Sequence, residues 1–437
     1  MNTPHRMARL ALTVAAVLGV TLAPASAATF VVDQDGQASA TDCGATQTAL
    51  PSIGAAVAAA GDGDTVVVCP GTTPYNEQLV INKALTIRGF AQTQVVIRPS
   101  PMFPNSTSAF SGAPIAAVIV VGDTTATLSQ LIVDAGGADL PSTDCSGPNL
   151  VGIFYRNASG VVSDSVVRNV RLPAGLEGCQ AGLGIFAQSG GGGGSVVQVD
   201  GVSVRDYQKN GIVGNEAGTT IQVSNSLITG NPAANVSVQN GLQIGFGATG
   251  TIIANRIVDQ IYLPCTFPYT PGGGCDTGAS LGILVFDAAI DVAIYDNVIA
   301  NTQAGIYIGG GIIASGSNRA DLSGNTVDAT SVFDGIVIVG DAHSVSRNTI
   351  TRADGTGIFL SGNDNRVTSN RIQETAVGIW SYSGTGNLYP ISGARANTLF
   401  NVETPALGSA ALSAESARSR SGASRAASRT VATPRRY

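Results

Sequence analysis

A short segment in the middle of the chain holds the residues best suited to acid–base chemistry. Arg205 and Asp206 are followed by Lys209, and Arg168 takes the place of Arg205 in an earlier segment of similar pattern. A lysine of lowered pKa can remove the proton beside a sugar carboxylate when a cation neutralises that carboxylate. We therefore predict Lys209 as the base, Arg205 as the neutralising cation, and Arg168 and Asp206 as substrate-binding residues. The alternative is that all four are solvated turn residues.

Two further groups extend this candidate site. Asp206 and Asp259 occupy equivalent turns, and calcium prefers carboxylate oxygens, so these two are the predicted ligands if the site holds calcium. Tyr262, Phe267 and Tyr269 fall in one long loop, and sugar sites commonly contain aromatic rings. We expect Tyr262 and Tyr269 to contact substrate. The same rings could instead form a small core of the loop itself.

The charge balance excludes one class of partner. The net charge is −6, and setting aside two arginines before residue 28 and a net +5 after residue 410 leaves −13 for the body of the chain. Lys83 and Lys209 are the only lysines in the sequence. Nucleic acid binding needs clustered cations, so we expect no nucleic acid partner. A small basic cluster in an acidic body favours an anionic sugar instead.

The elements that must position these residues follow from two repeated columns. The first is an asparagine between apolar residues, as in IYDNVI and LSGNTV, at Asn255, Asn297, Asn325, Asn348, Asn370 and Asn397. The intervals of 42, 28, 23, 22 and 27 residues indicate a coil of about 22 residues with loops of varying length. The second is a Gly-Ile or Gly-Leu pair, which recurs at residues 152, 184, 211, 241, 282, 305, 335, 357 and 378. The segments are β-branched and punctuated by Gly, Asn and Asp, which favours strands and turns over a helical solenoid.

Such coils cannot bury their apolar faces alone and must stack, with Ile on Ile along the interior. The sequence therefore predicts an all-β, right-handed parallel β-helix over residues 28–404. We expect the asparagine column to form a hydrogen-bonded ladder at the turns rather than a catalytic array. Residues 52–60 are expected to form a short capping helix with Ser52 as N-cap, ahead of a first strand at 65–68.

Insertions at one corner of each coil predict a walled groove. The turns are long at 134–150, 169–183 and 259–281, and short at 206–210, which would form the floor. The six cysteines favour disulfides, since the sequence has no CxxC pair and only two histidines. Six cysteines allow 15 pairings. Our preferred set joins neighbours: Cys43–Cys69, Cys145–Cys179 and Cys265–Cys275.

One run carries a family resemblance. SIGAAVAAAGDGDTVVVCPGTTPYNEQLVINKALTIRG, together with the two columns, resembles the pectate-lyase-like right-handed parallel β-helix superfamily over about residues 50–400. The resemblance implies the fold, whereas activity within the superfamily ranges over lyases, hydrolases, epimerases and proteins without known chemistry. The chain lacks the DD and GHG motifs of the superfamily's glycoside hydrolases. His343 lies in a turn, where we expect a structural role.

The chain ends predict export. Arg6 and Arg9 precede an apolar run and an Ala25-Ser26-Ala27 cleavage site, so residues 1–27 read as a signal peptide. Residues 405–437 are rich in Ser, Ala and Arg and are expected to be disordered. We expect a secreted monomer, extracellular or periplasmic, without a membrane span. Two functions stay open: a lyase or epimerase acting on acidic extracellular polysaccharide, and a non-catalytic binding or structural solenoid.

Overall fold

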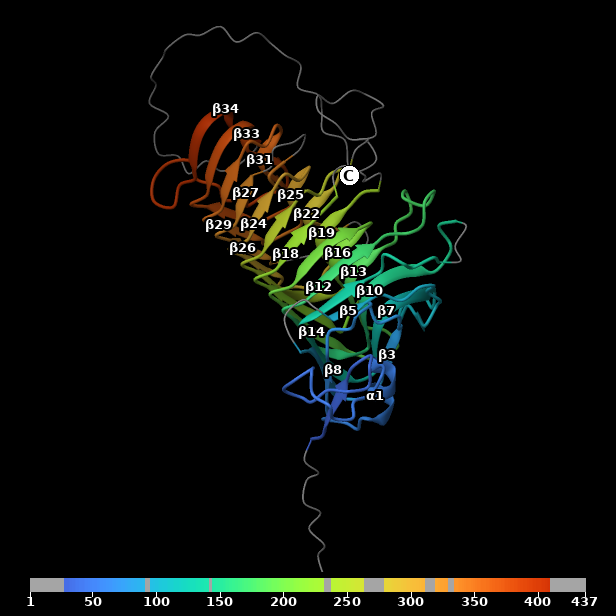
Figure 1. Ribbon diagram of the computed structural model, residues 1–437. Helices are drawn as coiled ribbons and strands as arrows, with labels where there is room; N and C mark the ends of the chain where they lie inside the picture. The colour runs from blue at the N-terminus through green and yellow to red at the C-terminus, as the bar shows by residue number, and fades with distance from the viewer. Residues whose placement is uncertain are drawn as a thin grey trace, which may run out of the picture.

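The chain forms one long stack of coils, a parallel β-helix (Figure 1). The computed structural model describes residues 27–90, 95–140, 144–231, 237–262, 279–310, 319–328 and 334–408. The predicted signal peptide apart from its last residue, and all but the first four residues of the predicted tail, lie outside these ranges. Those four residues belong to the last strand, β34 (Thr398–Gly408).

Three parallel sheets form the sides of the stack. Sheet 1 contains β1 (Thr29–Val32), β2 (Thr65–Val68), β4 (Leu85–Gly89), β8 (Thr125–Ser129), β11 (Ser159–Ser163), β14 (Ser195–Asp200), β17 (Thr219–Ser224), β20 (Thr249–Ile253), β23 (Ala293–Tyr295), β26 (Asp321–Ser323), β29 (Ser344–Ser346) and β32 (Arg366–Thr368). Sheet 2 contains β5 (Val95–Ile97), β9 (Leu131–Asp134), β12 (Val166–Val170), β15 (Ser203–Tyr207), β18 (Leu227–Thr229), β21 (Arg256–Val258), β24 (Val298–Ala300), β27 (Thr326–Asp328) and β30 (Thr349–Thr351).

Sheet 3 forms the third side of the stack. It contains β3 (Leu79–Ile81), β7 (Pro114–Gly122), β10 (Asn149–Arg156), β13 (Leu183–Gln188), β16 (Asn210–Asn215), β19 (Asn240–Gly245), β22 (Leu281–Phe286), β25 (Ala304–Gly309), β28 (Ile336–Val339) and β31 (Thr356–Ser361). The long strands β33 (Arg371–Ser383) and β34 continue both sheet 2 and sheet 3. The short β6 (Ser106–Thr107) pairs antiparallel with β7.

The Gly-Ile column lies in sheet 3, as the stacking argument predicted. Ile153, Ile185 and Ile212 are register partners on β10, β13 and β16, and all are buried in the main core. The glycines before them allow the sheets to approach. A Cβ on Gly184 would lie 2.4 Å from the carbonyl oxygen of Gly211 and 2.6 Å from Val204 Cγ1, so a larger residue cannot fit there.

The asparagine column forms a continuous ladder between sheets 1 and 2. From Asn255 to Asn370, each member donates its backbone N–H and one side-chain N–H to Oδ1 of the asparagine one coil on, at 2.9–3.0 Å. Asn397 ends the ladder, which confirms its structural role. In an earlier coil Ser226 takes the same place, and its backbone N–H donates to Asn255 Oδ1 at 3.0 Å.

The helix α1 (Ile53–Ala59) lies at the N-terminal end of the stack (Figure 1), with Ser52 as its N-cap. The Ser52 hydroxyl accepts a hydrogen bond from the Ala55 N–H at 3.1 Å, and Ile53 is buried in the core. The strand predicted as the first is the second. β1 pairs in parallel with β2, so one further strand extends sheet 1 beyond the predicted start.

Candidate functional site

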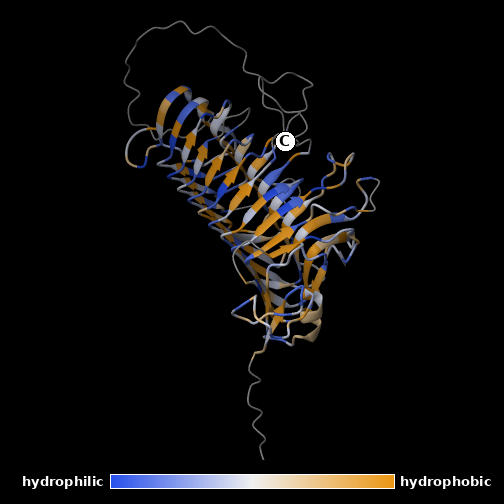
Figure 2. Ribbon diagram, in the orientation of Figure 1, coloured by the Kyte–Doolittle hydropathy of each residue, from blue (hydrophilic) through white to orange (hydrophobic). Residues whose placement is uncertain are grey.

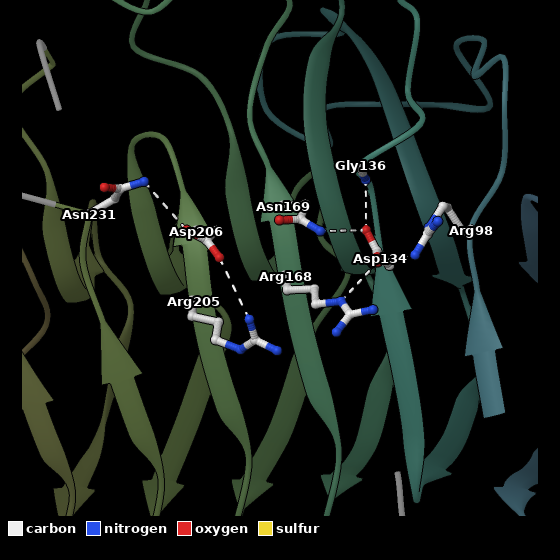
Figure 3. Close-up of polar contacts among 8 residues, drawn as sticks. All are labelled: Arg98, Asp134, Gly136, Arg168, Asn169, Arg205, Asp206 and Asn231. Carbon is white, nitrogen blue, oxygen red and sulfur yellow. Dashed lines mark hydrogen bonds and ion pairs between the residues drawn. The ribbon is translucent and has the colours of Figure 1, made fainter. Parts of the chain in front are cut away.

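The structure places Arg168 and Arg205 on neighbouring strands, and Lys209 in a cavity that neither arginine lines. Arg168 Nε donates to Asp134 Oδ2 at 2.8 Å, and Arg98 donates to the same oxygen at 3.0 Å (Figure 3). Burial raises the pKa of Asp134, but hydrogen bonds from Asn169, Gly136 and Arg168 outweigh it and leave the pKa below its usual value. Arg168 therefore neutralises a buried carboxylate, and its contact with substrate stays a prediction.

Arg205 has a different environment. It is the register partner of Arg168, on β15 beside β12, and its side chain lies on the same outer face (Figure 3). Its Nη1 is 3.7 Å from Asp206 Oδ2, and both side chains are well exposed. Asp206 also accepts a hydrogen bond from Asn231 at 3.4 Å. Arg205 and Asp206 thus form a solvated ion pair on sheet 2.

The two predicted calcium ligands stand apart. Asp206 and Asp259 both have left-handed backbone conformations, with φ of 52° and 68°, at the corner that follows sheet 2. β18 lies between their strands, so they are two coils apart, about 9.6 Å along the stack. Asp259 accepts a hydrogen bond from Asn301 at 2.6 Å. Among the described residues, no group of three His, Cys, Asp or Glu could hold a metal ion.

Lys209 lies past the same corner, at the start of the outer face of sheet 3. It lines a cavity of about 390 Å³. Its Nζ donates to the backbone carbonyl of Val238 at 2.6 Å, and burial lowers the pKa of Lys209 to about 8. Among the described residues that line the cavity, Lys209 is the only charged one. The structure therefore leaves one of the three predicted cations, Lys209, in a concave site, without Arg168 or Arg205.

Three carboxamides of the lining, Asn210, Asn215 and Gln243, form the polar floor of this cavity, and Asn240 extends their hydrogen-bonded chain. Asn240 donates to Asn210 Oδ1 at 2.9 Å, and Asn210 donates to Gln243 Oε1 at 3.0 Å. Gln243 in turn donates to Asn215 Oδ1 at 3.0 Å. These residues sit on the neighbouring strands β16 and β19, where hydrophilic segments interrupt an apolar sheet (Figure 2). The network fixes the orientation of each amide, and the floor can donate and accept hydrogen bonds without carrying charge.

The loop before β7 supplies one wall. Ser108 Oγ and the Ala109 N–H donate to Gln188 Oε1 at 3.1 and 2.8 Å, which attaches this loop to the C-terminal end of β13. Phe110, 74% exposed, lines the cavity together with Phe186 and Phe246. Sequence reasoning missed this wall and the carboxamide floor. The floor could have been found, because the residues that alternate with the Gly-Ile column point outward from the same strands.

A disulfide lies beside the cavity lining in the sequence. Cys43–Cys69 and Cys145–Cys179 are both present, as predicted, whereas Cys265 and Cys275 lie outside the described residues. Asn149 and Gln180, which line the cavity, flank the second bridge in the sequence. Gln208, the residue before Lys209, donates to the carbonyl oxygens of Leu176 and Cys179 at 2.8 and 2.9 Å. The cysteine-bearing loop therefore positions the segment that carries the lysine.

Two other predicted residues can be placed. The backbone N–H of Tyr262 donates to Gln303 Oε1 at 3.0 Å, but Tyr262 does not line the cavity. Tyr269 lies outside the described residues. His343 is fully buried, and its Nδ1 accepts a hydrogen bond from the Ala320 N–H at 3.2 Å. The backbone N–H of His343 donates to Asn365 Oδ1, and Asn365 donates in the same way to Asn387. His343 therefore belongs to a second ladder and has the expected structural role.

Known structures share this architecture. The Dettilon tailspike protein has a TM-score of 0.54 at 14% identity, over 85% of this chain and 68% of that one. A GH136 lacto-N-biosidase from Eubacterium ramulus has a TM-score of 0.53 at 12% identity, over 86% and 67%. A mannuronic acid specific polysaccharide family 6 lyase from human gut microbiota has a TM-score of 0.53 at 11% identity, over 86% and 83%. Among curated proteins, none matches the sequence.

The chain is a right-handed parallel β-helix protein. The resemblance to the pectate-lyase-like superfamily is thereby confirmed at the level of the fold. Residues 275–401, less than half of the chain, match the family described as "Periplasmic copper-binding protein (NosD)". Copper prefers imidazole, thiolate and thioether ligands. The only histidine in this stretch is His343, whose Nδ1 is engaged as described, so the described residues do not fit a copper site.

The compartment follows from the disulfides. Two bridges in one chain indicate an oxidising environment outside the cytosol. Within the described ranges, no helix has the length and apolar character to cross a membrane.

Proposed function

We propose that the protein binds an acidic extracellular polysaccharide over the outer face of sheet 3 and removes a proton beside a uronate carboxylate. The observation that carries the proposal is Lys209, a lysine without an acidic partner in its cavity and with a pKa of about 8. About a tenth of its amine is then neutral at pH 7 and can accept a proton, far more than for a lysine of ordinary pKa. A cationic, acid-free cavity in an acidic protein also selects an anionic sugar.

The chemistry would be β-elimination. The Lys209 amine takes the proton from the carbon next to the carboxylate, and the electron pair of that C–H bond forms a C=C bond. The C–O bond to the next sugar then breaks, and its oxygen takes a proton from the lysine ammonium or from water. Returning a proton to the opposite face of the same carbon would instead give an epimer. In both reactions negative charge develops on the carboxylate.

In this proposal the carboxamides of the cavity stabilise the substrate carboxylate, the role predicted for Arg205 from the sequence. Asn210, Asn215 and Gln243 lie within the lining of the Lys209 cavity, where an amide N–H can donate to a carboxylate oxygen. Their fixed orientation means that little reorganisation is needed when charge develops. One structural neighbour, by its own description, is specific for a polymer of mannuronic acid. That description supports an acidic sugar as the first substrate to test.

A second candidate function is binding without catalysis. The described lining of the cavity contains one titratable side chain, so no separate acid protonates the leaving oxygen. A glycan-binding solenoid would use the charged form of Lys209 as an anchor for a carboxylate. The two functions require opposite protonation states of the same amine, and this difference separates them by experiment.

The test is turnover of uronate polymers. Purified protein is incubated with mannuronate, guluronate and galacturonate polymers, with calcium or a chelator, and unsaturated ends are followed by ultraviolet absorbance and epimers by NMR. We expect turnover of one polymer and a loss of at least a hundredfold in Lys209→Ala. Arg256→Ala, which removes an exposed cation of sheet 2, is the control. Turnover that persists in Lys209→Ala would refute the base assignment, and binding without turnover would favour the second function.

A further inference from the structure

Three aromatic side chains gather on the outside of sheet 3, far along the stack from the cavity. Phe359 of β31 lies 5.6 Å from Trp380 of β33 and 5.8 Å from Tyr382, measured between ring centroids. Trp380 and Tyr382 are 5.8 Å apart. Tyr382 is 52% exposed, so the cluster opens to solvent rather than closing a core. We call Phe359, Trp380 and Tyr382 the aromatic platform.

A β-bulge lies within this platform. Leu360 pairs with Ser381, but Ser361 pairs with Ser383, so Tyr382 is an extra residue in β33 with no partner on β31. Bulges change the direction of a side chain and tend to occur beside functional sites. Trp380 and Tyr382 are two residues apart in β33, so both side chains point to the outer face of the strand. Tyr382 stacks on Phe359 with an interplanar angle of 28°.

The platform lies in line with the Lys209 cavity. Val213 of the cavity lining is connected to Phe359 through register partners on β19, β22, β25 and β28. Five strand-to-strand steps correspond to about 24 Å along the stack. The strands between them form one continuous face (Figure 1). A hexose in an extended chain is about as long as the spacing between coils, so a linear glycan can follow this face.

We propose that the aromatic platform is a remote sugar-stacking subsite, and that the polysaccharide lies along the helix axis from the Lys209 cavity to Trp380. This inference rests on the proposed function and adds a minimum length to it. The apolar faces of pyranose rings pack on exposed aromatic rings, and their hydroxyl groups stay in water. An oligomer of about six units would reach both ends, whereas a trimer would fill only the cavity.

The sequence supplies the probe, because Trp380 is the only tryptophan in the chain. Tryptophan fluorescence of the full protein is titrated with a mannuronate trimer and with an oligomer of about eight units, which exceeds the 24 Å span. We expect the long oligomer to change the emission and to bind at least tenfold more tightly than the trimer. The trimer should leave the emission unchanged.

Variants separate stacking from general destabilisation. Tyr382→Ser and Phe359→Leu should weaken the long oligomer about fivefold to tenfold and leave trimer binding unaltered. Phe400→Ser, which removes an aromatic residue that is 61% exposed on β34, is the matched control. Equal affinities for the two oligomers with constant emission would overturn the platform while leaving the proposed function intact. Absence of binding and turnover for all uronate polymers would overturn both.

Discussion

Glu77 and Lys83 hold the two ends of the same helix. The carboxylate of Glu77 accepts hydrogen bonds from the backbone N–H groups of Ile53 and Gly54 at 2.9 and 2.7 Å, at the start of α1. Lys83 Nζ donates to the carbonyl oxygens of Val57, Ala58 and Ala60 at 3.0, 2.8 and 2.7 Å, at the end of α1. Each charge matches the end of the helix dipole that it contacts, so together they fix the helix against the first coils.

Removing either contact should loosen the N-terminal end of the stack. We expect Glu77→Gln and Lys83→Met each to lower the free energy of unfolding by about 1–3 kcal/mol, because hydrogen bonds to charged groups are lost. Urea unfolding measures the loss, and hydrogen exchange at residues 53–59 locates it. Glu403→Gln, at an exposed position of β34, is the control. Unchanged exchange in α1 would contradict this role.

The asparagine ladder should be intolerant of apolar replacement. Asn325→Leu removes the acceptor for Asn297 and the donors to Ile294 and Asn348, all in a buried setting. We expect a loss of about 3 kcal/mol or more, since buried polar groups lose their partners. Asn301→Gly, which removes an exposed asparagine side chain and tolerates the left-handed backbone there (φ 50°), should cost less than about 1 kcal/mol. Similar midpoints of urea unfolding for the two variants would argue against the ladder as a stabilising element.

Acid should destabilise the fold through His343. Burial lowers its pKa to about 4, below the unfolded value of 6.5, so the folded protein favours the neutral ring. Its contribution is complete above pH 6.5 and is lost as the pH falls toward 4, at about 1.4 kcal/mol per pH unit. His343→Asn, which continues the ladder with Asn365, should flatten this part of the stability profile. Equal slopes for the two proteins between pH 6.5 and 4 would disprove the assignment.

The pH dependence of turnover should identify the active form of Lys209. A base works as the neutral amine, so kcat/KM should rise with pH and level off above about 8, the pKa set by burial. An anchoring cation would give the opposite trend, because affinity for the polymer would fall as the amine deprotonates. Steady-state kinetics and direct binding measured across the same pH range distinguish the two.

The two disulfides should have separable effects. Cys145→Ser/Cys179→Ser should weaken polymer binding several-fold, because the bridged loop holds Gln208 and the cavity-lining residues beside it. Cys43→Ser/Cys69→Ser lies at the N-terminal end and should lower stability by about 2–4 kcal/mol without changing affinity. Calorimetry on both variants gives the affinities. If both variants bind equally well, the bridged loop does not shape the site.

The fold was predictable because every coil repeats the same environment. The Gly-Ile column marks sheet 3 in each coil, and the asparagine column marks the turn between sheets 1 and 2. Few folds are compatible with two columns that share one period. β1 escaped prediction because it precedes the repeat and carries neither column. The N-cap Ser52 was found from local chemistry alone.

The site was predictable only in part. A sequence repeat shows which position of the coil a residue occupies, but it does not show which side chains that residue contacts. Lys209 was found as an unusual cation at a short turn. The ion pair of Arg168 with Asp134 was overlooked, although Asp134 follows Val133 just as Arg168 follows Val167, so the aligned columns already contained it. The wall formed by residues 108–114 could not be foreseen, because it folds over sheet 3 from an irregular segment that carries no repeat.

The insertions at the corner between sheets 2 and 3 have an evolutionary consequence. Each coil exchanges hydrogen bonds mainly with the coil before it and the coil after it, so a longer excursion at this corner leaves the remaining layers undisturbed. Mutations in one corner loop can therefore change the binding specificity of one coil, while the aliphatic core of the stack stays the same. In such a solenoid, binding specificity can evolve without a change of fold.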